Sequence, residues 1–221
     1  MEELINSFED SILDPHLDLS TDVTNISAEF LSITGFPLYG FLIKTVSTTA
    51  KVLLSVRDKW LIYKTYATAQ ALNSRTIDPY KLEKYRKKLK NPKYAMEEAG
   101  RLLELIDQST EVNKCRILGR IYNHYINEEL TFEQFYELTE ALHRMFTIDH
   151  DELIIAHKNG SVGMETENSY RLDRLIAVGL LENKNRVGDF ILKDNGDLYL
   201  QTTNCTLTKL GELYCKYGLE L

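Results

Sequence analysis

Three histidines and the carboxylates around them are the residues best suited to chemistry in this chain. His143, His150 and His157 recur every seven residues, and three acidic residues surround His150. Imidazole and carboxylate groups bind borderline and hard metal ions, which makes a hydrolytic metal site conceivable. Such a site needs at least three converging ligands, and heptad spacing on one helix aligns no more than two. We therefore interpret these histidines as solvated or hydrogen-bonded, and expect no catalytic residue, no metal and no cofactor.

One pair nevertheless resembles a known catalytic motif. His150-Asp151 is similar to the His-Asp doublet of all-helical metal-dependent phosphohydrolases. That family also requires an upstream histidine and a downstream aspartate, for which His124 and Asp173 are the candidates, although neither lies in a recognisable motif. The sequence contains no G-x-G-x-x-G, P-loop, G-x-S-x-G or H-E-x-x-H motif. We expect a protein that is not an enzyme, with a phosphohydrolase as the alternative.

The cysteines and the start of the chain bear on location. Cys115, Cys205 and Cys215 form an odd set without a C-x-x-C pair, so a disulfide framework is not expected. The opening MEELINSFEDSIL is acidic and lacks the basic and apolar regions of a secretory signal. Both features favour the cytoplasm, with attachment to the membrane surface as an alternative. Each cysteine is expected to be a small buried residue, and apolar periodicity turns Cys115 inward.

A basic helix is the most suggestive surface. Asp78-Pro79 predicts a helix start, and the residues that follow are rich in lysine with interleaved tyrosines. Spacings of three and four residues place several of its cations on one face. Pairing with acids elsewhere in the chain is the preferred interpretation of this solvated face, and an anionic lipid or a nucleic acid is the alternative partner. The residues predicted to contact an anionic partner are Lys84, Arg86, Lys87, Lys88 and Lys90.

Charge is divided into blocks along the 221 residues, whose net charge is −7. Residues 1–34 carry eight acids and no lysine or arginine, residues 35–93 have a net charge of +10, residues 94–160 one of −7, and residues 161–221 one of −2. Hydrophobic residues make up 43% and charged residues 27%, as in ordinary globular proteins. The blocks predict either internal neutralisation or docking to an oppositely charged partner.

An apolar stretch precedes the basic helix. Residues 30–43 contain no charge, and a helix is expected near 37–56. The charge-free run is shorter than the roughly 20 residues that a membrane span needs. A buried core helix is the preferred interpretation, and a conditional membrane-inserting or oligomer-forming helix is the alternative.

Capping signals predict most of the remaining helices. A helix is expected to continue to Asn73-Ser74, and Asn91-Pro92 opens another that reaches about Asp107. Thr131 and Gln134 form a capping box for a helix predicted to reach Phe146. Further helices are expected over 111–126, before Asn159-Gly160 and before Gly179, and at the end of the chain, with a β-hairpin around 194–197.

The last part of the chain resembles a winged-helix domain. The segments that carry the resemblance are Leu175-Ile176-Ala177-Val178-Gly179-Leu180-Leu181 and Leu207-Thr208-Lys209-Leu210-Gly211. In DNA-binding members, the helix before the wing enters the major groove. The resemblance makes Arg171 and Arg174 possible nucleic-acid contacts, but acids at the hairpin tip would repel phosphate. The whole chain also looks weakly like uncharacterised bacterial helical proteins, some associated with phage defence.

These observations predict a mainly α protein, with a helical region over 1–110 and a winged-helix-like α+β region with one β-hairpin over 111–221. The expected function is a non-catalytic interaction or regulatory module that assembles with another protein or with itself, in the setting of bacterial or phage defence or counter-defence. The alternatives are a membrane-acting abortive-infection-type effector and a DNA-binding winged-helix regulator. A membrane surface and, less strongly, a nucleic acid are the other expected partners.

Overall fold

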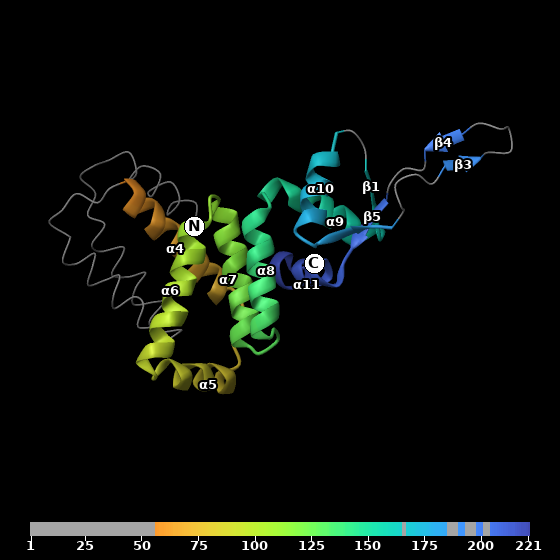
Figure 1. Ribbon diagram of the computed structural model, residues 1–221. Helices are drawn as coiled ribbons and strands as arrows, with labels where there is room; N and C mark the ends of the chain where they lie inside the picture. The colour runs from red at the N-terminus through yellow and green to blue at the C-terminus, as the bar shows by residue number, and fades with distance from the viewer. Residues whose placement is uncertain (1–55, 165–166, 185–189, 193–197, 201–203) are drawn as a thin grey trace. The chain divides into compact units, whose positions relative to one another are not determined.

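The computed structural model describes residues 56–164, 167–184, 190–192, 198–200 and 204–221 (Figure 1). This part of the chain is mostly helical, with eight α-helices and a small three-stranded antiparallel sheet. The mainly α prediction is therefore confirmed. The acidic N-terminal segment and the apolar helix expected near 37–56 lie outside the described residues.

The contacts of the described residues form two compact units that meet within one helix. The first contains residues 56–119 and 126–129, and the second contains residues 120–125 and 130–221. The predicted domain limits at residues 110 and 111 stay a prediction.

The first unit is built from four helices whose ends follow the capping signals. Asp78 Oδ1 accepts hydrogen bonds from the backbone N–H groups of Tyr80 and Lys81. Asn91 caps the next helix in the same way, and proline occupies the first turn of both helices. The helices are α4 (Val56–Asn73), α5 (Pro79–Leu89), α6 (Pro92–Gln108) and α7 (Val112–Ile126), and residues 120–125 of α7 belong to the second unit. In Figure 1, α5 lies crosswise at the end of α6.

Helices α4 and α7 approach closely at Gly119. A Cβ atom at this position would lie 2.3 Å from the Thr68 carbonyl oxygen and 2.9 Å from the Ala71 Cβ, so only glycine fits here. The buried ammonium group of Lys64 donates hydrogen bonds to the carbonyl oxygens of Asp107 and Ser109 at the end of α6. This lysine satisfies carbonyl groups that the helix leaves unpaired at its C-terminus.

The second unit combines helices with short strands. Thr131 and Gln134 form the predicted capping box at the start of α8. Gly160 and Gly179 adopt left-handed conformations, with φ of 77° and 80°, where two further helices end. The helical elements are α8 (Phe132–Arg144), the 3₁₀ turn η1 (Thr147–Asp149), α9 (His150–Asn159), α10 (Ser169–Ala177), α11 (Lys209–Tyr214) and the π-helical turn η2 (Cys215–Leu219).

Five strands complete the second unit. The central strand β5 (Asn204–Leu207) pairs with β1 (Val162–Gly163) on one side and with β2 (Leu181–Asn183) on the other, both antiparallel. Strands β3 (Phe190–Leu192) and β4 (Leu198–Leu200) form the predicted hairpin, with Ile191 opposite Tyr199. The hairpin is confirmed, whereas the strands of the three-stranded sheet were not predicted from the sequence pattern.

One helix boundary was predicted wrongly. The helix that was expected to reach Phe146 ends at Arg144, because Met145 is extended with φ −97° and ψ 172°. The backbone N–H of Phe146 donates a hydrogen bond of 2.8 Å to the carboxylate of Asp149 instead of continuing the helix. A side chain three residues ahead therefore competes with the helical hydrogen bond and starts η1.

Candidate interaction surfaces

The predicted anionic-partner residues lie on α5 and differ in their surroundings. Lys84 forms an ion pair of 2.6 Å with Glu128, and Lys87 one of 3.9 Å with Glu83 on its own helix. Within the described residues Lys88 and Lys90 form no ion pair, and both are exposed. Arg86 is half-buried. The helix thus presents an exposed basic face made of Lys84, Lys87, Lys88 and Lys90.

The pair between Lys84 and Glu128 partly neutralises this basic face. The hydrogen bond from Lys84 to the Glu128 carboxylate, together with the negative charge of Glu128, raises the pKa of Lys84. The same hydrogen bond lowers the pKa of Glu128, with Lys88 and Lys81 contributing further positive charge. Both side chains are about half exposed, at 51% and 42%, so solvent weakens the interaction. Internal neutralisation therefore acts on Lys84 and Lys87, and leaves Lys88 and Lys90 exposed without an ion pair in the described residues.

Arg174, a predicted nucleic-acid contact, is bound to a buried carboxylate. Its Nε and Nη2 atoms donate hydrogen bonds to Asp149, at 2.8 and 2.6 Å. Asp149 is fully buried, whereas the Arg174 side chain is 25% exposed. The hydrogen bond to Asp149 raises the pKa of Arg174. A planar bidentate pair of this kind holds the guanidinium in one orientation.

Two exposed rings lie against the guanidinium of Arg174. Its Cζ atom is 4.7 Å from the centre of the Phe146 ring and 5.7 Å from that of the Tyr170 ring. Phe146 is 51% and Tyr170 54% exposed, so both rings also face solvent. Cation–π contacts at these distances add to the fixation of the arginine. Together with Arg171 these residues form the arginine–aromatic surface, defined as Phe146, Tyr170, Arg171 and Arg174.

Arg171 has a similar environment. It lies 3.7 Å from the carboxylate of Glu152, and its Nε donates a hydrogen bond of 3.2 Å to the Tyr170 hydroxyl. That hydrogen bond, together with the negative charges of Glu152 and Asp149, raises the pKa of Arg171. The Glu152 side chain is only 7% exposed. Both arginines that the winged-helix resemblance assigned to nucleic acid are therefore compensated by carboxylates of their own unit.

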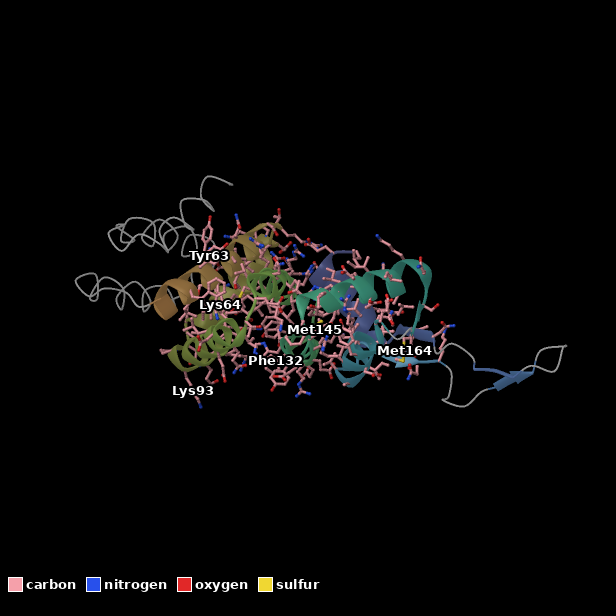
Figure 2. The ribbon with its side chains drawn as sticks, turned by 90° about the horizontal axis from the view of Figure 1, so that it is seen from above. Tyr63, Lys64, Lys93, Phe132, Met145 and Met164 are labelled. Carbon is pink, nitrogen blue, oxygen red and sulfur yellow. The ribbon has the colours of Figure 1, made fainter. Side chains whose placement is uncertain are left out.

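A third surface, on α8, was missed by the sequence analysis. Phe132 and Tyr136 are one helical turn apart, 42% and 51% exposed, with ring centres 6.4 Å apart (Phe132 is labelled in Figure 2). Three glutamates share the exposed side of the helix. We define the acidic–aromatic face as Phe132, Glu133, Tyr136, Glu137 and Glu140. The i, i+4 spacing of the two rings, which places them on one side of the helix in a row with Glu140, was the signal that could have revealed it.

The seven-residue histidine series does not form a metal site. His150 is buried and its Nε2 lies 3.0 Å from the Tyr214 hydroxyl, whereas His157 is exposed and His143 half-buried. His124 packs its ring at 4.6 Å against Tyr217. Across the described ranges, no three histidine, cysteine or acidic side chains gather in an arrangement that could hold a metal ion. His150 contacts a hydrogen-bond partner in the protein interior instead.

The three cysteines are free and buried, which confirms the prediction of small interior residues. Burial raises the pKa of Cys115 and of Cys205, and it raises that of Cys215 to about 11. A nucleophilic thiol requires a lowered pKa and access to solvent. These environments therefore favour an inert structural role for the thiols.

No family model, no curated protein and no solved structure matches the chain. In the part of the chain that the structure describes, no helix is both long enough and apolar enough to cross a membrane.

Proposed function

We propose that this chain is a non-catalytic interaction module that assembles with a partner protein or with itself. The observation that carries the proposal is the arginine–aromatic surface, in which two half-exposed rings enclose a guanidinium held by a buried aspartate. Tyrosine and arginine are enriched among the residues that contribute most binding energy in protein interfaces, and phenylalanine is enriched in interface cores.

The fixed geometry of Arg174 supports a binding role for the surface. Ordering a long side chain during association costs free energy, and Arg174 is already ordered by two hydrogen bonds to Asp149 and by its contacts with Phe146 and Tyr170. The rings can be buried by a partner without separating the ion pair beneath them. Aromatic residues and arginine are enriched in the buried centre of protein interfaces.

The charges near this surface favour a protein over a nucleic acid. Arg171 and Arg174 are each compensated by a carboxylate, and Asp173 and Glu167 are exposed nearby in the sequence. Phosphate groups are attracted by uncompensated cations and repelled by acids. The DNA-binding alternative therefore has less support than protein assembly, and the membrane-acting alternative depends on residues 30–56, which lie outside the described part of the chain.

Affinity purification of the full chain from its native cells tests the proposal. We compare the unmodified chain with a Phe146→Ala/Tyr170→Ala variant and with Ile155→Ala, which removes an isoleucine that is 41% exposed on α9. We expect one stoichiometric partner, or a defined oligomer, whose yield falls about tenfold or more in the double variant and is unchanged in the control. Thermal unfolding verifies that all three proteins are folded.

Three results would overturn the proposal. A chain that is monomeric and partner-free in its native cells does not assemble. Unchanged assembly of the double variant would remove the arginine–aromatic surface as its basis. Metal-dependent turnover of nucleotides or phosphoesters by the purified chain, lost when the metal is removed, would contradict the non-catalytic role.

A further inference from the structure

The exposed side of α8 combines aromatic rings with uncompensated acid. Residues Phe132, Tyr136 and Glu140 follow one another at intervals of four, and Glu133 and Glu137 form a parallel row beside them. Residues 135, 138, 139, 141 and 142 are buried on the side away from the three glutamates, which borders on Phe132. Arg144 is the cation of this helix surface, and it pairs at 3.5 Å with Glu140. Two of the three glutamates thus remain without an ion pair in the described residues.

The acid at the start of this face is firmly ionised. A hydrogen bond from its own backbone N–H and one from Thr131 lower the pKa of Glu133. The first turn of a helix also favours negative charge, because the unpaired N–H groups there carry partial positive charge. A cation that approaches Phe132 therefore meets a full negative charge beside the ring.

The rings of the face have a rigid base. The ring centre of Phe132 lies 6.4 Å from that of Tyr125, and the Tyr125 ring stacks on the buried Phe135 with 4.8 Å between their centres. The ring centres of Phe135 and Tyr122 are 5.6 Å apart. This series of rings connects the exposed pair to the core of the unit. A supported ring flanked by carboxylates is a favourable site for a lysine or arginine side chain, which can contact the ring with its methylene groups or its charge.

The matching cations are present in the same chain, on α5. The basic face defined above holds four exposed lysines, and Glu83 is the one acid on this helix. Lys93, at the start of α6, is 86% exposed, and Figure 2 shows it projecting from the helix. The ion pairs that these lysines form with Glu83, Glu97 and Glu128 involve exposed side chains, so they can exchange for other carboxylates at little cost.

We infer that the acidic–aromatic face of α8 in one copy binds the basic face of α5 in a second copy of this chain. The inference goes beyond the proposed function, because it adds a self-assembly contact on surfaces separate from the arginine–aromatic surface. A second copy of the chain is the expected partner, because the described residues of one chain carry both an acidic face and a basic face. Their opposite charges attract each other. The two faces are different surfaces, so the contact is head-to-tail, and an assembly of any length leaves one face of each kind at its two ends for a further copy.

Two variants, each damaged on one face, provide the test. Lys87→Glu/Lys88→Glu reverses the charge of the basic face, and Phe132→Ser/Tyr136→Ser removes the rings of the acidic–aromatic face. We expect the unmodified full chain to form species larger than a monomer between about 1 and 100 μM, as measured by analytical ultracentrifugation. Each variant alone is expected to sediment as a monomer, and an equimolar mixture as a heterodimer that grows no further.

The mixing result is specific to head-to-tail contact. One intact face of each kind remains in the mixture, so one contact forms and the damaged faces stop growth. A Glu104→Lys variant, which reverses an exposed acid on α6 outside both faces, serves as the control and should assemble like the unmodified chain. Raising the salt from about 50 to about 500 mM should weaken assembly, because exposed charges are screened. Circular dichroism shows whether each variant keeps its helices.

Several results would overturn the inference. One is an unmodified chain that stays monomeric over the whole concentration range. Another is a folded variant that alone assembles to the size of the unmodified chain. The third is a mixture of the two variants that stays monomeric. If the chain still binds a partner protein through Phe146 and Tyr170 while remaining monomeric alone, the self-assembly fails and the proposed function stands. If it neither self-assembles nor binds a partner, both fail.

Discussion

Both carboxylate oxygens of Asp149 accept hydrogen bonds from the guanidinium of Arg174, although the two residues are 25 positions apart. Asp149 also accepts a hydrogen bond from the backbone N–H of Phe146. This bond positions the Phe146 ring, which lies against the guanidinium of Arg174. One buried carboxylate therefore ends α8, starts η1 and orders the arginine–aromatic surface. The stability of the second unit and the shape of its proposed binding surface depend on the same residue.

Arg174→Met should destabilise the protein more than Asp149→Asn. Without Arg174, a fully buried carboxylate loses its charge partner, which costs about 3–5 kcal/mol. Without the Asp149 charge, Arg174 can still reach solvent with the exposed quarter of its side chain, so we expect a loss of about 1–3 kcal/mol. Urea unfolding measures both values, and Arg144→Met, which removes an exposed pair, should cost less than about 1 kcal/mol. The reverse order would contradict the assigned roles.

The stability of the protein should fall between pH 9 and pH 11, in part because of Cys215. Burial raises the pKa of this thiol from its ordinary value of 9.0 to about 11. Below pH 9 the thiol is protonated in both states and contributes no pH dependence. Above pH 9 the unfolded state releases its proton first, so unfolding is favoured by up to about 2–3 kcal/mol once pH 11 is passed.

Cys215→Ala isolates this contribution. The free energy of unfolding, measured by urea titration from pH 7 to pH 11, should decline less steeply in the variant than in the unmodified chain. Some decline is expected to remain, because burial also raises the pKa of the neighbouring Tyr214 well above its ordinary value. Equal slopes in the two proteins would show that Cys215 ionises as readily in the folded state as in the unfolded chain.

Two glycine substitutions should have opposite effects. At Gly119 a Cβ would lie 2.3 Å from the Thr68 carbonyl oxygen, so Gly119→Ala must separate α4 from α7 and should cost about 3 kcal/mol or more. At Gly100, in α6, no atom lies within 4 Å of such a Cβ, and Gly100→Ala should stabilise the helix by about 0.5–1 kcal/mol. Thermal unfolding of the pair measures both effects. A neutral Gly119→Ala variant would contradict the close approach of the two helices.

Asn127 should be necessary for placing α5. Its Oδ1 accepts a hydrogen bond of 2.9 Å from the backbone N–H of Asp78, and its backbone carbonyl oxygen accepts one from the Lys81 ammonium group. Asn127→Ala removes the side-chain contact inside the protein and should cost about 1–3 kcal/mol. Asn113→Ala, at an exposed position whose side chain accepts a hydrogen bond from Arg116, is the matched control and should cost less than about 0.5 kcal/mol. Equal unfolding free energies for the two variants would exclude this role of Asn127.

Local signals in the sequence predicted the helices well, because each signal acts within one helical turn. Asp78, Asn91 and Thr131 cap helices where the sequence placed them, and Gly160 and Gly179 end helices in left-handed conformations. The capping hydrogen bonds join groups two or three residues apart, so the identity of neighbouring residues decides them. The same reasoning found the β3–β4 hairpin, whose turn residues are adjacent in the chain.

The three-stranded sheet and the partners of the charged residues were decided by tertiary structure. Strands of two to four residues are too short to show an alternating pattern, and β5 forms because β1 and β2 offer it hydrogen bonds from distant positions. The sequence by itself determined that the chain is mainly helical, that its thiols are interior, and that its positive and negative charges occupy separate blocks. Only the tertiary structure decided which cations are compensated, because Arg174 and Lys84 meet Asp149 and Glu128 through contacts 25 and 44 residues away along the chain.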